Sequence, residues 1–142
     1  MVFLHSLLRY AVLFALLYAV VTNLRGWLTG RPILTGERMI TIVAMVLCHI
    51  QLLFGAILYA MNWNALKSRE LDPFHKFIKY EHAGSMVLAV ALITLGRMLS
   101  KRAQGEGPKQ RQIALFYGMG LLLILWAIPW PFRDIGHSLG WL

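Results

Sequence analysis

Residues 39–61, MITIVAMVLCHIQLLFGAILYAM, form a long apolar run that contains no Asp, Glu, Lys or Arg. An α-helix rises about 1.5 Å per residue, so about 20 residues of this kind cross the hydrocarbon layer of a bilayer. Long apolar runs with charges confined to their flanks are typical of helices that face lipid. The run therefore predicts a transmembrane helix.

Three further stretches are apolar and long enough to be spans. The whole chain of 142 residues is 58% apolar and only 14% charged, with a mean hydropathy of +0.62, which a soluble domain of this size would not show. We expect an all-α, integral membrane four-helix bundle that forms one domain over residues 1–142, with the remaining spans at 2–24, 82–99 and 113–130.

The third of these four spans is the shortest, and its helix is expected to start well before the membrane. Asp72 is followed by Pro73. An acid can cap the first free N–H groups of a helix, and proline suits the first helical position. We therefore predict that the helix of span 82–99 begins near residue 73.

The distribution of basic residues predicts the direction of the bundle. One side has eight bases, and the other side has five: Lys67, Arg69, Lys76, Lys79 and Arg133. Cytoplasmic loops carry the excess of Lys and Arg. We expect both termini on the outer, periplasmic side of a bacterial inner membrane. The eight bases on the inner side are Arg25, Arg31, Arg38, Arg97, Lys101, Arg102, Lys109 and Arg111.

Several function classes are disfavoured by the sequence. The net charge of +8 does not indicate nucleic-acid binding, because the bases mark membrane-edge loops and do not form one polar face with exposed aromatic residues. The chain has no nucleotide-binding glycine loop, no Cys-x-x-Cys-His motif and no Ser/His/Asp arrangement typical of a hydrolase. Its one cysteine, Cys48, lies in an apolar run, so disulfides are not expected.

Histidines inside the predicted spans are the main candidates for chemistry. Measured from the basic inner edge of each span at the rise of a helix, His5 lies roughly 30 Å away, His82 roughly 28 Å and His49 roughly 16 Å. Two imidazoles at one depth on different helices are what a six-coordinate b-type haem requires. His5 with His82 meets this condition, and His49 with His82 stays open because helix tilt shifts these depths. A hydrogen bond to a neighbouring helix is the alternative role for each histidine.

Two arginines accompany these histidines at the outer side. Arg9 lies four residues after His5 and so shares its helix face. A charged side chain there must reach outward, pair with Glu81, or hold an anionic group such as a haem propionate or a quinone oxygen. Arg133 follows the segment AIPWPF, whose Trp130 and Phe132 either anchor the chain at the interface or line a quinone pocket.

A divalent metal site is a competing interpretation of the same outer side. His75 and His82 are seven residues apart and share a helix face. Imidazole and carboxylate groups are the usual ligands of such ions. The spacing matches no established ligand motif, and the further candidate ligands are His5, His137, Glu81 and Asp134.

Four segments carry a resemblance to a known family: HSLLRY at 5–10, CHIQLLFGAILY at 48–59, FIKYEHAGSMVLA at 77–89 and IPWPFRD at 128–134. Together they make the chain similar, over nearly its whole length, to small four-helix membrane proteins of Bacteroidota that are commonly labelled "cytochrome B". The resemblance implies haem, with its histidines at positions 5, 49 and 82 and its cations at positions 9 and 133. Span 113–130 has no histidine, so at most one haem is easily ligated.

The sequence leaves two main hypotheses for function. The first is a b-type cytochrome-like protein that binds one haem b near the outer leaflet and transfers electrons, with quinone as a candidate partner. The second is a non-catalytic membrane subunit or assembly factor of a larger respiratory or envelope complex. An outer-side metal-binding protein is the third alternative. The lipid bilayer is an expected partner in each case.

Overall fold

A computed structural model describes residues 1–68, 72–136 and 141. Within these residues every regular element is helical, and none is a strand. In chain order the elements are α1 (Val2–Thr29), α2 (Thr35–Met61), α3 (Trp63–Leu66), α4 (Pro73–Lys76), the π-helix η1 (Phe77–His82), α5 (Ala83–Arg102) and α6 (Glu106–Ala127).

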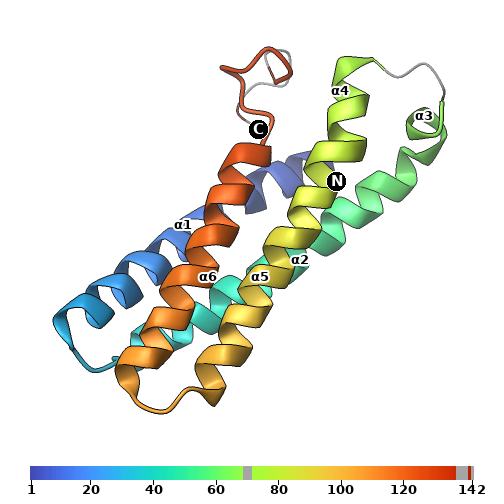
Figure 1. Ribbon diagram of the computed structural model, residues 1–142. Helices are drawn as coiled ribbons and strands as arrows, with labels where there is room; N and C mark the ends of the chain where they lie inside the picture. Colours follow the sequence, from blue (N-terminus) through green and yellow to red (C-terminus); the bar gives the residue numbers. More distant parts are fainter. Residues whose placement is uncertain (69–71, 137–140, 142) are drawn as a thin grey trace.

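Four helices of the described chain are long and apolar enough to cross a membrane, which confirms the predicted fold class. They are α1, α2, the continuous helix Pro73–Arg102 and α6. The ribbon runs back and forth along one axis, and both ends of the chain lie at the same end of the bundle (Figure 1). We call this the terminal end, and we call the opposite end, where α1 joins α2 and α5 joins α6, the basic end.

The core lies where α6 packs against α1 and α5, and α1 also packs along α2, whereas α2 and α5 contact each other less. Small residues allow these close approaches: Ala19, Ala44 and Ala89 are fully buried. Larger apolar side chains such as Leu16 and Ile93 fill the spaces between them. Van der Waals packing of this kind holds membrane helices together, because lipid offers them no hydrophobic driving force.

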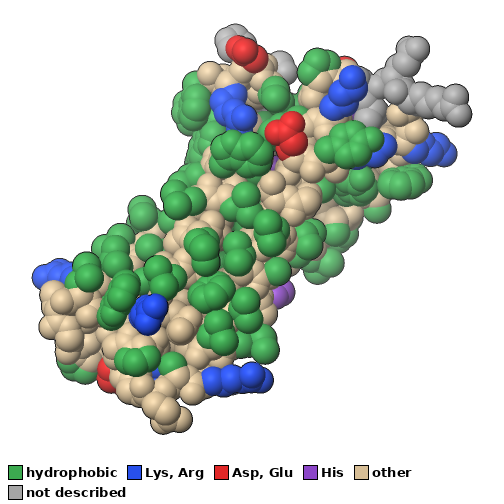
Figure 2. Space-filling model, in the orientation of Figure 1, with side chains coloured by type: hydrophobic (Ala, Val, Ile, Leu, Met, Phe, Trp, Pro, Cys, Tyr) green, Lys and Arg blue, Asp and Glu red, His purple; other side chains and the backbone are tan. Residues whose placement is uncertain are grey.

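Large apolar side chains also cover the outside of the bundle. Phe14, Leu53, Val87 and Leu122 are each more than half exposed, at 73%, 62%, 58% and 70%. Figure 2 shows such side chains along the length of one face, with Lys and Arg gathered towards the two ends. This pattern fits contact with a lipid bilayer by a multi-pass membrane protein.

The helix that contains span 82–99 begins as predicted at Asp72 and Pro73. The Asp72 carboxylate accepts a hydrogen bond from the backbone N–H of His75, and proline occupies the first turn. The His75 side chain also bonds to this carboxylate and lowers the pKa of Asp72. Five residues further on, the backbone widens into η1, in which the N–H of Ala83 bonds to Ile78 O.

The last helix differs from the predicted span at both ends. It begins at Glu106 and not at 113, and Gly105, which has a positive φ of 89°, directly precedes its first residue. It ends at Ala127 and not at 130, because the residue before a proline is pushed out of the helical region and Ile128 precedes Pro129. The connection between α5 and α6 is therefore short.

The close contact between α5 and α6 gives a test of the packing. A Cβ at Gly120 would lie 2.8 Å from Ile93 Cγ1 and 3.2 Å from the Ala89 carbonyl oxygen. Gly120→Ala is expected to destabilise the protein by about 1 to 3 kcal/mol, the usual cost of overpacking a core. Gly118→Ala on the same helix is the matched control, since its Cβ would meet only Val20 Cγ1 at 3.9 Å.

Both variants remove a glycine from α6, so they share the same gain in helix propensity. Thermal unfolding in detergent, followed by circular dichroism, gives the comparison. Equal melting temperatures for the two variants would contradict the packing described here.

Candidate functional site

The two histidines predicted at one depth meet at the terminal end of the bundle. His5 projects from the first turns of α1, and His82 is the last residue of η1. Their ring centres are 6.4 Å apart, and the ring planes are inclined by 73°. Helix α1 does not pack extensively against η1 or α5, so these two side chains approach each other between helices that are not direct neighbours.

Two prolines after α6 decide which backbone carbonyls are available at this end. In a continuing helix, the carbonyls of Leu125 and Ala127 would accept the N–H groups of residues 129 and 131. Both of these residues are proline, which has no N–H group. Each of the two carbonyls therefore needs a donor from outside the helix, since an unpaired carbonyl in the bilayer is costly.

Side chains provide these donors. Trp130 Nε1 donates to Leu125 O at 2.9 Å, and His82 Nδ1 donates to Ala127 O at 2.8 Å. The second bond fixes the orientation of the His82 imidazole and places its proton on Nδ1. Its Nε2 atom is then a lone-pair nitrogen, the form in which imidazole binds a metal.

His5 is held by α2. The Gln51 side-chain amide donates to the backbone carbonyl of His5 at 2.9 Å and lies 3.4 Å from its Nε2. Four residues along the same face, Gly55 leaves space for the ring, because a Cβ there would lie 3.3 Å from His5 Cε1. The Nδ1 atom of His5 and the Oε1 atom of Gln51 are both buried without a hydrogen-bond partner.

One alternative from the sequence was an ion pair between Arg9 and Glu81. The described residues form no such pair. The Arg9 guanidinium donates to Tyr10 Oη at 3.0 Å and to the Trp141 carbonyl at 2.7 Å, and it lies 5.6 Å from the ring centre of Trp130. A hydroxyl and a carbonyl accept bonds from Arg9 Nη2, its Nε is buried without a partner, and no acid of the described residues pairs with it. The positive charge of Arg9 therefore remains available at the terminal end.

Arg133 reaches back to the end of α6. Its Nη1 donates to Trp126 O at 2.6 Å and to Ile128 O at 3.3 Å, and its guanidinium lies 5.6 Å from the centre of the Phe77 ring. The Phe77 ring in turn lies 6.3 Å from the His82 ring. A single aromatic side chain thus separates this second cation from the histidine pair.

His49 is not part of this group. Its Nδ1 bonds to Met45 O at 2.8 Å, and its Nε2 lies 3.3 Å from Thr94 Oγ1 on α5. The residue as a whole is exposed, although its ring contacts α5. His5 contacts α2 at Gly55, six residues further along and roughly 9 Å away at the rise of a helix.

Within the described part of the chain, the residues proposed for a divalent metal site do not form one. In the ranges 1–68 and 72–136, no three His, Cys, Asp or Glu side chains form a group that could hold an ion. His75 bonds to Asp72 at the surface, and His137 lies outside the described residues.

Sequence reasoning did not find the supporting role of Gln51, Gly55 and Ala127. A signal for the first two was present, since residues four apart on α2 lie on one helix face. For Ala127, the signal lies in Pro129 and Pro131. Neither has an N–H group, so the carbonyls four residues earlier need other donors.

Comparisons of the chain with protein-family models, with curated proteins and with solved structures find no match.

The bond between His82 and α6 predicts a loss of stability on substitution. His82→Phe keeps an aromatic ring of similar shape but leaves Ala127 O, on a fully buried residue, without a donor. The free energy of unfolding is expected to fall by about 1 to 3 kcal/mol, the usual cost of an unsatisfied buried group. His75→Phe, at the surface, should change it much less. Chemical denaturation in detergent measures both, and equal effects would contradict this role of His82.

Proposed function

We propose that this protein is a membrane b-type cytochrome-like protein that binds one haem through His5 and His82 and transfers electrons. The observation that carries the proposal is the pair of imidazoles brought together from helices α1 and η1, 6.4 Å apart between ring centres. Bound haem would supply a one-electron redox couple, which none of the side chains at this end supplies by itself.

The separation of the two rings fits a shared iron. Metal–imidazole bonds are about 2 Å long and each nitrogen lies about 1 Å from its ring centre, so rings on opposite sides of one iron have centres roughly 6 Å apart. The observed separation of 6.4 Å agrees with this value.

Each ring also has a nitrogen that no hydrogen bond in the described structure occupies. On His82 this is Nε2, because Nδ1 bonds to Ala127 O. On His5 it is the buried Nδ1. Ligation through Nδ1 places the ring proton on Nε2, next to the Gln51 amide, whose buried Oε1 has no donor. Rotation of that amide would let Oε1 accept the proton, which is the usual outer support of a metal-bound histidine.

The two arginines would hold the acidic groups of the cofactor. Among the described residues, no acid pairs with Arg9 or Arg133, and only carbonyls and a hydroxyl accept their hydrogen bonds. Guanidinium groups bind carboxylates well, and the propionates of haem are carboxylates. The stacked rings of Trp130 and Phe132, 5.8 Å apart, would offer a flat apolar surface to a quinone, the proposed electron partner.

The proposal includes a location. The excess of bases at the basic end supports a bacterial inner membrane in which that end faces the cytoplasm and the terminal end faces the periplasm. The histidine pair would then lie near the outer leaflet, where it could exchange electrons with a quinone or with a larger respiratory complex.

One observation favours a second candidate function, that of a non-catalytic subunit of a larger membrane complex. His49 is exposed on α2, roughly 16 Å from Arg38 along the helix. Ionisable side chains within membrane helices usually face protein. A partner helix would cover this imidazole. If His49→Leu abolishes the co-purification of a partner protein, that result supports this candidate.

Haem binding gives a direct test of the first proposal. Protein expressed with haem supplied is expected to show a sharp α-band on reduction with dithionite. His5→Ala and His82→Ala should each abolish this band, because each removes one axial ligand, and His49→Ala should retain it. Visible absorption spectroscopy of purified protein measures all four samples.

A colourless, folded protein at full expression would overturn the haem proposal. So would a band that His49→Ala abolishes and His5→Ala leaves intact, because the ligands would then lie elsewhere. Circular dichroism of each variant shows whether the helices are retained, and so separates the loss of a ligand from the loss of the fold.

A further inference from the structure

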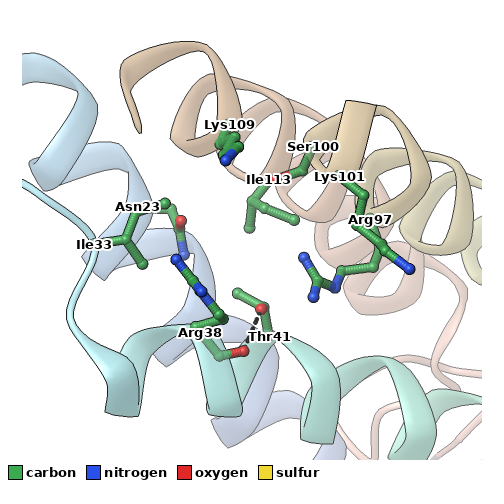
Figure 3. A pocket seen from close by; sticks show the side chains of 9 residues that line it. All are labelled: Asn23, Ile33, Arg38, Thr41, Arg97, Ser100, Lys101, Lys109 and Ile113. Carbon is green, nitrogen blue, oxygen red and sulfur yellow. Dashed lines mark hydrogen bonds between the residues drawn. The ribbon is translucent and has the colours of Figure 1, made fainter. Parts of the chain in front are cut away.

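A polar cavity of about 250 Å³ lies at the basic end, far from the histidine pair. Side chains from all four membrane-spanning helices surround it, and Figure 3 shows them converging on one space. Arg97, Ser100 and Lys101 come from one face of α5, since residues three and four apart are neighbours on a helix. The other polar side chains of the lining include Asn23 from α1, Arg38 from α2 and Lys109 from α6.

The charge of the cavity is positive and uncompensated. Four of its lining residues are bases, and none is an acid. The nearby acids have other partners: Glu37 pairs with Arg31 at 2.6 Å, and Glu106 accepts the N–H of Ile33 at 2.7 Å. Among the described residues, none of the four bases forms an ion pair with an acid.

A buried neutral donor also faces this space. Ser100 is only 4% exposed, lines the cavity, and its hydroxyl forms no hydrogen bond with another described residue. The other two buried polar side chains of the lining are already bonded, since Thr41 donates to Arg38 O and Asn23 donates to Ala19 O. Because Ser100 lines the cavity, its hydroxyl can donate to an oxygen atom of a ligand bound there.

From these observations we propose that the cavity binds a phosphate group, supplied by the head group of an anionic phospholipid. Several bases around one space repel each other, and an anion among them removes this repulsion. Phosphate has oxygens enough for the planar fork of arginine and for point-charge contacts from lysine. Basic pockets between membrane helices on the cytoplasmic side are typical sites for anionic head groups.

Thermal unfolding in a zwitterionic detergent tests this proposal. Phosphatidylglycerol added to the micelles is expected to raise the melting temperature of the wild-type protein, whereas phosphatidylcholine should not. A parallel sample receives inorganic phosphate at matched ionic strength and no added lipid. Its melting temperature shows whether a free phosphate stabilises the protein as a lipid does. Stabilisation by inorganic phosphate as strong as that by phosphatidylglycerol would overturn the lipid source.

Variants show whether the cavity is the binding site. The combined change Arg97→Gln and Lys109→Gln should weaken phosphatidylglycerol binding at least tenfold, and Ser100→Ala should weaken it less. Arg25→Gln combined with Arg102→Gln is the matched control, because both bases lie at the same end and neither lines the cavity.

The variants are compared by their melting temperatures at increasing fractions of phosphatidylglycerol, and the temperature without the lipid shows that each one folds. Equal weakening in the control would overturn the proposal, since it would reveal general surface attraction. Absence of stabilisation by both phosphatidylglycerol and inorganic phosphate in the wild-type protein would overturn it as well.

Discussion

The missing N–H groups of Pro129 and Pro131 are the constraint on which the terminal end of this bundle depends. They leave the carbonyls of Leu125 and Ala127 without helical partners at the end of a helix that is apolar enough to cross a membrane. Trp130 and His82 donate to these carbonyls at 2.9 and 2.8 Å, and Arg133 caps the same helix end. A backbone requirement thereby orients the imidazole of His82 and brings a cation close to it.

The two ends of the bundle differ in chemistry although the same helices form them. At the terminal end, imidazoles and aromatic rings lie among arginines whose hydrogen bonds go to carbonyls and a hydroxyl. At the basic end, lysines and arginines surround a cavity without an acid in its lining. Small residues such as Gly120 and Ala89 hold the helices close between them. The middle of the bundle thus sets the distance between the helices, and its two ends provide the polar groups.

The fold was largely predictable from the sequence, because long apolar runs separated by charges leave little choice within a bilayer. The start of the helix Pro73–Arg102 was predictable for a local reason, because Asp72 can cap the first turn and Pro73 suits its first position. The end of α6 was predicted too late, although Pro129 marks it. The sequence predicted only that His5 and His82 lie at a similar depth in the membrane. The rise of a helix gives the depth of a residue, but it does not show which helix faces meet. The support from Gln51 and Gly55 required the structure, because it depends on how α1 and α2 are rotated.

Electron paramagnetic resonance of the ferric protein tests the central claim most directly, namely that His5 and His82 bind one haem iron from opposite sides. Their ring planes are inclined by 73°, and nearly perpendicular imidazole ligands give a low-spin signal with strongly anisotropic g values, whereas parallel ligands give a rhombic one. The account predicts the strongly anisotropic low-spin signal. A high-spin signal from iron with a single histidine ligand, or protein that contains no haem iron, would contradict it.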